Sequence, residues 1–138
     1  EKEKEAQNSE TNIKQKDPLE EIAYKDPYVF FLERTFSPKW EEIISKIESD
    51  SEKDWKFAII EADALLDLLL KNKGVPGENM KEKLNSIKGQ NVADIDQLWT
   101  AHKVRNEIAH NTNFKLDKKE AIKILKFYKQ AFVNLGAL

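Results

Sequence analysis

The chain has 138 residues, 35% of them charged, with 23 Lys and Arg against 25 Asp and Glu, so its formal net charge is −2. This balance excludes the strong positive field of a nonspecific nucleic-acid binder, and the lack of Cys excludes disulfides and thiolate chemistry. No apolar run approaches the roughly 18–20 residues of a membrane span, and the length suits one compact domain. The lack of Cys fits a reducing compartment, so a cytoplasmic location is expected.

The first part of the chain is predicted to lie outside the main domain. Residues 1–17 contain almost nothing to bury and are expected to form a disordered tail or linker. Residues 18–50 are expected to form an N-terminal helical extension, in which Ser37 as N-cap and Pro38 in the first turn start a helix. Before that helix comes an aromatic cluster that should pack on the main body, formed by Tyr28, Phe30, Phe31 and Phe36.

The main helical domain is predicted over residues 51–138, and its longest helix over 51–74. Apolar residues recur there at helical spacing, and Gly74 ends the pattern. The same helix has a second apolar face, made of Phe57, Ile60, Ala64 and Leu68. A helix with two apolar faces is either central in a bundle or part of a subunit contact.

The rest of the chain also predicts helices. A turn at 74–77 (GVPG) precedes a short helix, a fourth helix runs from about residue 94 to 110, and a final helix opens with a capping box of Asp117 and Glu120. No strand alternation is visible. The sequence therefore predicts an all-α bundle of four or five helices whose long helices are antiparallel.

The fourth helix contains the rarest polar residues of the chain, in the stretch LWTAHKVRNEIAHN. The chain has only two Arg and two His, and one of the Arg and both His lie in this window. At ~100° per residue, one arc of roughly 140° holds all four polar side chains of interest. They are His102, Arg105, Asn106 and His110.

These residue types suit cleavage of RNA. The planar guanidinium of Arg105 fits phosphate oxygens, His110 can exchange protons near neutral pH, and Asn106 can orient either neighbour. Together they could assist attack of a ribose 2′-hydroxyl on the adjacent phosphorus. The alternatives are structural: Arg105 could form a simple ion pair, and His110 could be favoured by the dipole at the helix end.

The segment VRNEIAH resembles the R-x4-H motif of HEPN-domain proteins, and the order of helices over residues 51–138 is similar to that family. The resemblance implies a HEPN-like helical homodimer whose motif helices meet at a cleft, with metal-independent endoribonuclease activity on RNA and no cofactor. It assigns catalytic roles to Arg105, Asn106 and His110. The alternative is a noncatalytic HEPN-like module that binds RNA, a nucleotide or a protein.

The residue after the motif and the likeness to membrane-anchored relatives bear on the expected partners. HEPN toxins controlled by nucleotidyltransferase antitoxins often carry a Tyr two residues after the His, where this chain has Thr112, which weakens a toxin–antitoxin or defence assignment. Small bacterial HEPN proteins with an upstream membrane segment are also similar, which would tether the domain to the cytoplasmic membrane face.

Three further residues could support the motif. His102 is expected to line the cleft or pack beside the motif, since His102 and His110 alone make a poor metal site. Glu61 and Asp63 could orient Arg105. Glu61 suits this role and an ordinary solvated helix face equally, whereas Asp63 suits the solvated face better.

Overall fold

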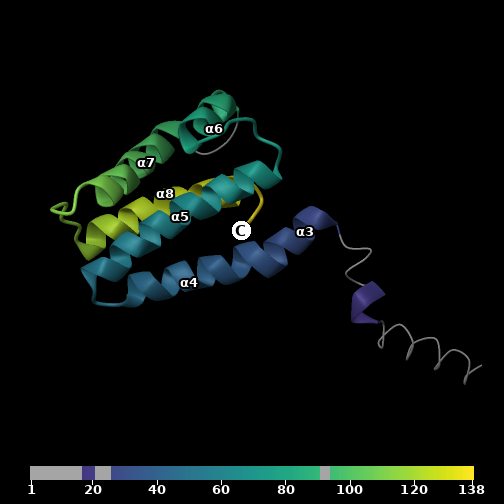
Figure 1. Cartoon of the computed structure of the whole chain (residues 1–138), viewed down its shortest axis with the longest axis horizontal. Helices are drawn as coiled ribbons and strands as arrows, with labels where there is room; N and C mark the ends of the chain where they lie inside the picture. The colour runs from purple at the N-terminus through teal and green to yellow at the C-terminus, as the bar shows by residue number, and fades with distance from the viewer. Residues whose placement is uncertain (1–16, 21–25, 91–93) are drawn as a thin grey trace, which may run out of the picture.

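The computed structural model describes residues 17–20, 26–90 and 94–138. Within these ranges the regular structure is entirely helical, which confirms the all-α prediction (Figure 1). Apart from Asp17, the predicted tail at 1–17 lies outside the described residues.

Three consecutive helical segments between residues 27 and 48 form one continuous helix. Helix α3 (Pro27–Phe31) passes through the π-helical segment η1 (Leu32–Phe36) directly into α4 (Ser37–Glu48). Helix α4 thus begins at Ser37, as predicted, but Ser37 is not an N-cap, because its own backbone is helical and the chain before it is already helical. Pro38 cannot donate a backbone hydrogen bond, and its ring would crowd the carbonyl four residues back in an α-helix. The wider π turn, in which Ser37 N–H donates to Leu32 O, accommodates it.

The body of the molecule consists of α4 and three further long helices, α5, α7 and α8. Helix α5 (Glu52–Asn72) packs against α4, against α7 (Ile95–His110) and against α8 (Lys118–Asn134). In Figure 1, α4 lies on one side of α5 and α7 on the other, while α8 lies behind α5. The chain runs in opposite directions along α4 and α5 and along α5 and α7, as expected for antiparallel long helices.

The core is shared by the predicted extension and the predicted main domain. Phe36 is fully buried, and its ring stands edge-on to the ring of Phe132 at 4.9 Å between centroids. Trp40, on α4, also stands edge-on to the Phe132 ring, at 5.4 Å between centroids. Such edge-to-face pairs add stabilisation beyond the burial of their area. The aromatic segment thus packs on the body of the bundle, as predicted, and helps to form its core.

The short helix α6 (Met80–Ile87) is positioned by the turn that precedes it. Gly77 has a φ of 134°, and a Cβ added there would lie 2.8 Å from the backbone nitrogen of Lys83. The Lys83 side chain is buried and its Nζ lies 2.6 Å from Asp67 Oδ1 on α5. Gly77 and this ion pair together hold α6 close to α5.

Candidate functional site

Helix α7 carries the predicted site, and its ends follow from local sequence. The Asp94 side chain accepts a hydrogen bond from Asp96 N–H and caps the first turn. Leu98 and Ala101 are buried and fix which side of the helix faces the bundle. His110 is the last helical residue, where the helix dipole favours a cationic side chain.

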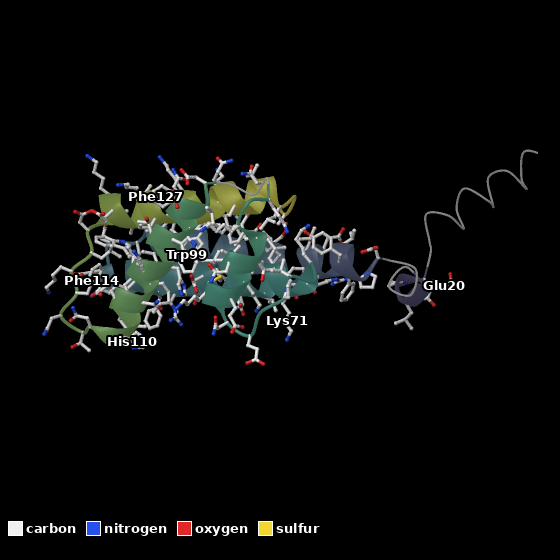
Figure 2. The ribbon with its side chains drawn as sticks, turned by 90° about the horizontal axis from the view of Figure 1, so that it is seen from above. Glu20, Lys71, Trp99, His110, Phe114 and Phe127 are labelled. Atoms are coloured by element: carbon white, nitrogen blue, oxygen red, sulfur yellow. The ribbon has the colours of Figure 1, made fainter. Side chains whose placement is uncertain are left out.

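The three residues assigned by the resemblance lie in the second half of α7 with different exposure. Arg105 and Asn106 are half-buried, and Arg105 Nη1 donates to Asn106 Oδ1 at 3.1 Å. His110 is exposed, at the end of α7 (Figure 2), and its side chain makes no hydrogen bond or ion pair with the described residues. Asn106 therefore contacts the arginine, and His110 is open to solvent.

A buried carboxylate on α5 lies beneath this part of α7. The Asp63 side chain is only 8% exposed, so the prediction of an ordinary solvated residue is wrong. Its Oδ2 accepts from the Tyr128 hydroxyl at 2.8 Å and lies 3.0 Å from His102 Nδ1. Because a carboxylate can only accept, His102 Nδ1 carries the proton in this contact. His102 therefore packs beside the motif, one turn before Arg105.

Arg105 approaches the same carboxylate without a hydrogen bond. Its Nε lies 3.9 Å from Asp63 Oδ1, which is beyond hydrogen-bond length, and this buried Nε has no hydrogen-bond partner in the structure. The interaction is an attraction between charges in a poorly solvated place, where it is stronger than in water. Arg105 thus pairs with a residue on another helix, as the structural alternative for this residue predicts.

The phenol of Tyr128 stays protonated in this setting. Burial raises its pKa well above the ordinary value, and the nearby negative charge of Asp63 and the hydrogen bond to it raise the pKa further. The positive charge of Arg105 acts in the opposite direction. The hydroxyl is therefore a dependable donor to Asp63, a contact between distant helices that no local pattern in the sequence indicates.

Glu61 does not share this cluster. Its Oε1 lies 2.6 Å from Lys46 Nζ on α4, so its ion pair links α5 to α4 and its contact is not with Arg105. Its other carboxylate oxygen is buried without a hydrogen-bond partner. The carboxylate that lies near Arg105 is thus that of Asp63, two residues further along the helix, and not that of Glu61.

A hollow of about 380 Å³ adjoins the motif helix. Five of its lining residues come from the first half of α5 and one, Ile108, comes from α7 between Arg105 and His110. Phe57 is 44% exposed beside it. The lining residues are Glu52, Lys53, Lys56, Phe57, Ile60 and Ile108. The predicted second apolar face of α5 therefore reaches the motif helix and is open to solvent.

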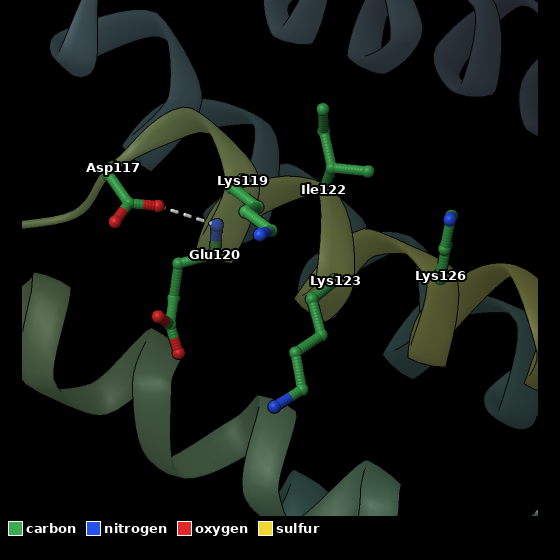
Figure 3. A pocket seen from close by; sticks show the side chains of 6 residues that line it. All are labelled: Asp117, Lys119, Glu120, Ile122, Lys123 and Lys126. Atoms are coloured by element: carbon green, nitrogen blue, oxygen red, sulfur yellow. Dashed lines mark hydrogen bonds between the residues drawn. The ribbon is translucent and has the colours of Figure 1, made fainter.

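A second hollow, of about 450 Å³, lies over the first turns of α8 (Figure 3). Its lining is mostly charged and comes from α8 and its N-cap Asp117, whose carboxylate accepts from Glu120 N–H at 2.7 Å. This hydrogen bond confirms Asp117 as the N-cap of the last helix, which is one half of the predicted capping box. None of the predicted site residues lines this hollow.

Comparison of the chain with family models, with curated proteins and with solved structures found no match. In the part of the chain that the structure describes, no group of three or more His, Cys, Asp or Glu side chains is arranged to hold a metal ion. Among the same residues, no helix is long and apolar enough to cross a membrane.

Proposed function

We propose that this chain is a HEPN-type endoribonuclease that cleaves RNA by attack of a ribose 2′-hydroxyl on the adjacent phosphorus. The observation that carries the proposal is the arrangement on α7: an anchored arginine followed, just over one turn later, by an exposed histidine. Arg105 supplies a fixed positive charge for a phosphate, and His110 supplies a group that can accept or donate a proton at neutral pH.

The roles follow from the chemistry of each side chain. A pentacoordinate phosphorus carries extra negative charge on its oxygens, which the Arg105 guanidinium stabilises by hydrogen bonds and charge. His110 is open to solvent and can remove the 2′-hydroxyl proton or protonate the leaving oxygen. Asn106 accepts a hydrogen bond from Arg105 Nη1 and so restricts the guanidinium to one orientation.

A homodimer would complete the site. Strand cleavage uses a base and an acid, whereas one chain places one histidine in the motif, so a two-fold axis near α7 would bring a second copy of His110 and Arg105. The exposed apolar face of α5 suits such a contact, with Phe57 at 44% and Leu68 at 36% exposure. This face adjoins α7 at the hollow that Ile108 lines.

The cleavage experiment compares variants of α7. Purified protein is incubated with single-stranded and structured RNA in the presence of EDTA, and 2′,3′-cyclic phosphate ends are measured. Changing His110 or Arg105 to alanine should lower the cleavage rate by roughly 10²- to 10³-fold. Glu107→Ala, on the exposed side of the same helix, is the matched control and should keep full activity. Equal rates for wild type and His110→Ala, or no cleavage of any RNA, would refute the proposal.

The dimer is tested with charges placed on the α5 face. Phe57→Asp should give a monomer in sedimentation velocity and should abolish cleavage. Val133→Asp introduces the same change at an equally exposed residue of α8 and should do neither. A wild-type protein that is monomeric at all concentrations and still cleaves RNA would contradict the dimeric site.

The second candidate is a noncatalytic HEPN-like module that binds RNA, a nucleotide or a protein. The observation in its favour is that Arg105 is already engaged by Asp63 and Asn106, which suits a structural role. It predicts binding without cleavage. Loss of that binding in Arg105→Ala would then place the ligand at α7, whereas unchanged binding would place it elsewhere.

A further inference from the structure

Asp63 is a negative charge inside the bundle that three side chains from two other helices approach. Tyr128 reaches it from α8 at 2.8 Å, and His102 reaches it from α7 at 3.0 Å. A buried carboxylate is tolerated only where such partners replace its water. Each partner is therefore held in place by the carboxylate as much as it stabilises the carboxylate.

The arginine of the motif meets this charge with one particular edge. Its Nε is buried, faces Asp63 Oδ1 at 3.9 Å and has no hydrogen-bond partner in the structure. Its Nη1 donates to Asn106, and the side chain as a whole is 34% exposed. Since the guanidinium is a rigid plane, burial of the Nε edge leaves the Nη end as the part that an anion can reach.

We propose that Asp63 is the positioning residue of the site: it holds the Nε edge of Arg105 inward, so that a phosphate is bound end-on by the Nη groups. His102 assists because it is fixed by the same carboxylate one turn before Arg105 on α7. The part of this inference that concerns RNA cleavage rests on the proposed function. The part that concerns the orientation of Arg105 does not.

A merely structural role for Asp63 predicts something different. If the carboxylate only anchors Tyr128 and His102, its loss lowers stability and changes nothing specific at Arg105. Tyr128→Phe serves as the comparison, because it removes one hydrogen bond to Asp63 and keeps the charge. A positioning role predicts that Asp63→Asn disturbs Arg105 and that Tyr128→Phe does not, even when both variants lose stability.

The small number of arginines in the chain allows the Arg105 side chain to be observed directly by NMR. Arg34 and Arg105 are the two arginines of the chain, so a proton–nitrogen spectrum of the full chain contains two arginine Nε signals, and Arg34→Lys assigns them. In the wild type, the Arg105 Nε proton should exchange slowly with water. Titration with inorganic phosphate should shift the Nη signals of Arg105 more than its Nε signal.

Asp63→Asn should make the Arg105 Nε proton exchange at least tenfold faster and should remove this difference in the phosphate titration. Asp67→Asn is the matched control, since Asp67 is an acidic residue of the same helix whose ion pair is with Lys83. It should leave the Arg105 signal unchanged. All spectra are recorded well below the unfolding temperature of each variant.

On RNA, Asp63→Asn should lower kcat about 10- to 100-fold with little change in KM, because a displaced arginine weakens the transition state more than the bound substrate. If the wild type cleaves no RNA, the proposed function fails, and the Nε exchange still decides the positioning role. An Arg105 Nε signal that is the same in Asp63→Asn and the wild type overturns the inference. So does an equal disturbance of Arg105 in Tyr128→Phe.

Discussion

Replacing Tyr128 with phenylalanine removes one hydroxyl from the centre of the bundle and leaves the ring in place. The residue is fully buried, and its hydroxyl donates to Asp63 Oδ2 at 2.8 Å. The substitution leaves the carboxylate with one hydrogen-bond donor, His102, and with the attraction of Arg105. It therefore tests how much a single donor contributes to keeping this charge inside the protein.

The expected loss follows from the kind of hydrogen bond. A bond to a charged group contributes roughly 1.5–3 kcal/mol, and the phenylalanine ring preserves the packing, so we expect a loss of about 2 kcal/mol. With an unfolding entropy of ~2.1 cal/mol/K per residue over 138 residues, this corresponds to a decrease in Tm of about 7 °C.

Urea and thermal unfolding followed by far-ultraviolet circular dichroism measure this change. Tyr28→Phe is the control, because the Tyr28 hydroxyl lies on the surface, 3.5 Å from Lys73 Nζ. Its effect should stay within about 0.5 kcal/mol. If Tyr128→Phe is as stable as the wild type, Asp63 does not depend on this donor, and the account of the buried cluster is wrong.

Three further predictions concern stability. The pKa of Tyr128 is raised above its unfolded value of 10.0, so the protonated hydroxyl contributes fully to the free energy of unfolding below pH ~10. This contribution is lost as the pH rises further. In alkaline urea titrations the stability difference between wild type and Tyr128→Phe should therefore shrink. Phe132→Ala should cost roughly 3–5 kcal/mol in the same assay, while its exposed neighbour Val133 tolerates alanine within about 0.5 kcal/mol. Gly74→Ala should lower the free energy of unfolding by about 1 kcal/mol through backbone strain alone. Gly77→Ala should lower it further, because a Cβ at Gly77 also meets backbone atoms whereas one at Gly74 meets nothing. Equal losses would contradict this reasoning.

Local signals in the sequence predicted most helix boundaries. The helix expected at 51–74 spans Glu52–Asn72, and the helix expected from about 94 to 110 spans Ile95–His110. Helical spacing of apolar residues, capping side chains and glycines act over a few residues, so they can be read without knowledge of the tertiary structure. The predicted N-cap role of Ser37 is wrong because the helix that carries the buried Phe31 and Phe36 continues through a π turn into α4.

The site was predicted in part for the same reason. Arg105, Asn106 and His110 share one helix, so their common arc can be read from spacing alone. The role of Asp63 depends on His102, 39 residues away, and on Tyr128, 65 residues away, and no local pattern shows such pairs.

One signal for Asp63 was present in the sequence. It lies four residues after Ile59 and three before Leu66, so it falls within the apolar arc of its own helix. A charged residue in that position indicates a buried carboxylate with partners on other helices.

The shared carboxylate also constrains how the sequence can change over time. Once Asp63 is lost, the Tyr128 hydroxyl and the His102 ring lack their acceptor, and once both donors are lost the charge lacks its solvation. Each single replacement therefore leaves a buried polar group without its partner, and a second replacement among the three positions costs less than it would in the wild type. We expect the three positions to vary together among descendants of this chain, so that a lineage that abandons one of them soon abandons the others.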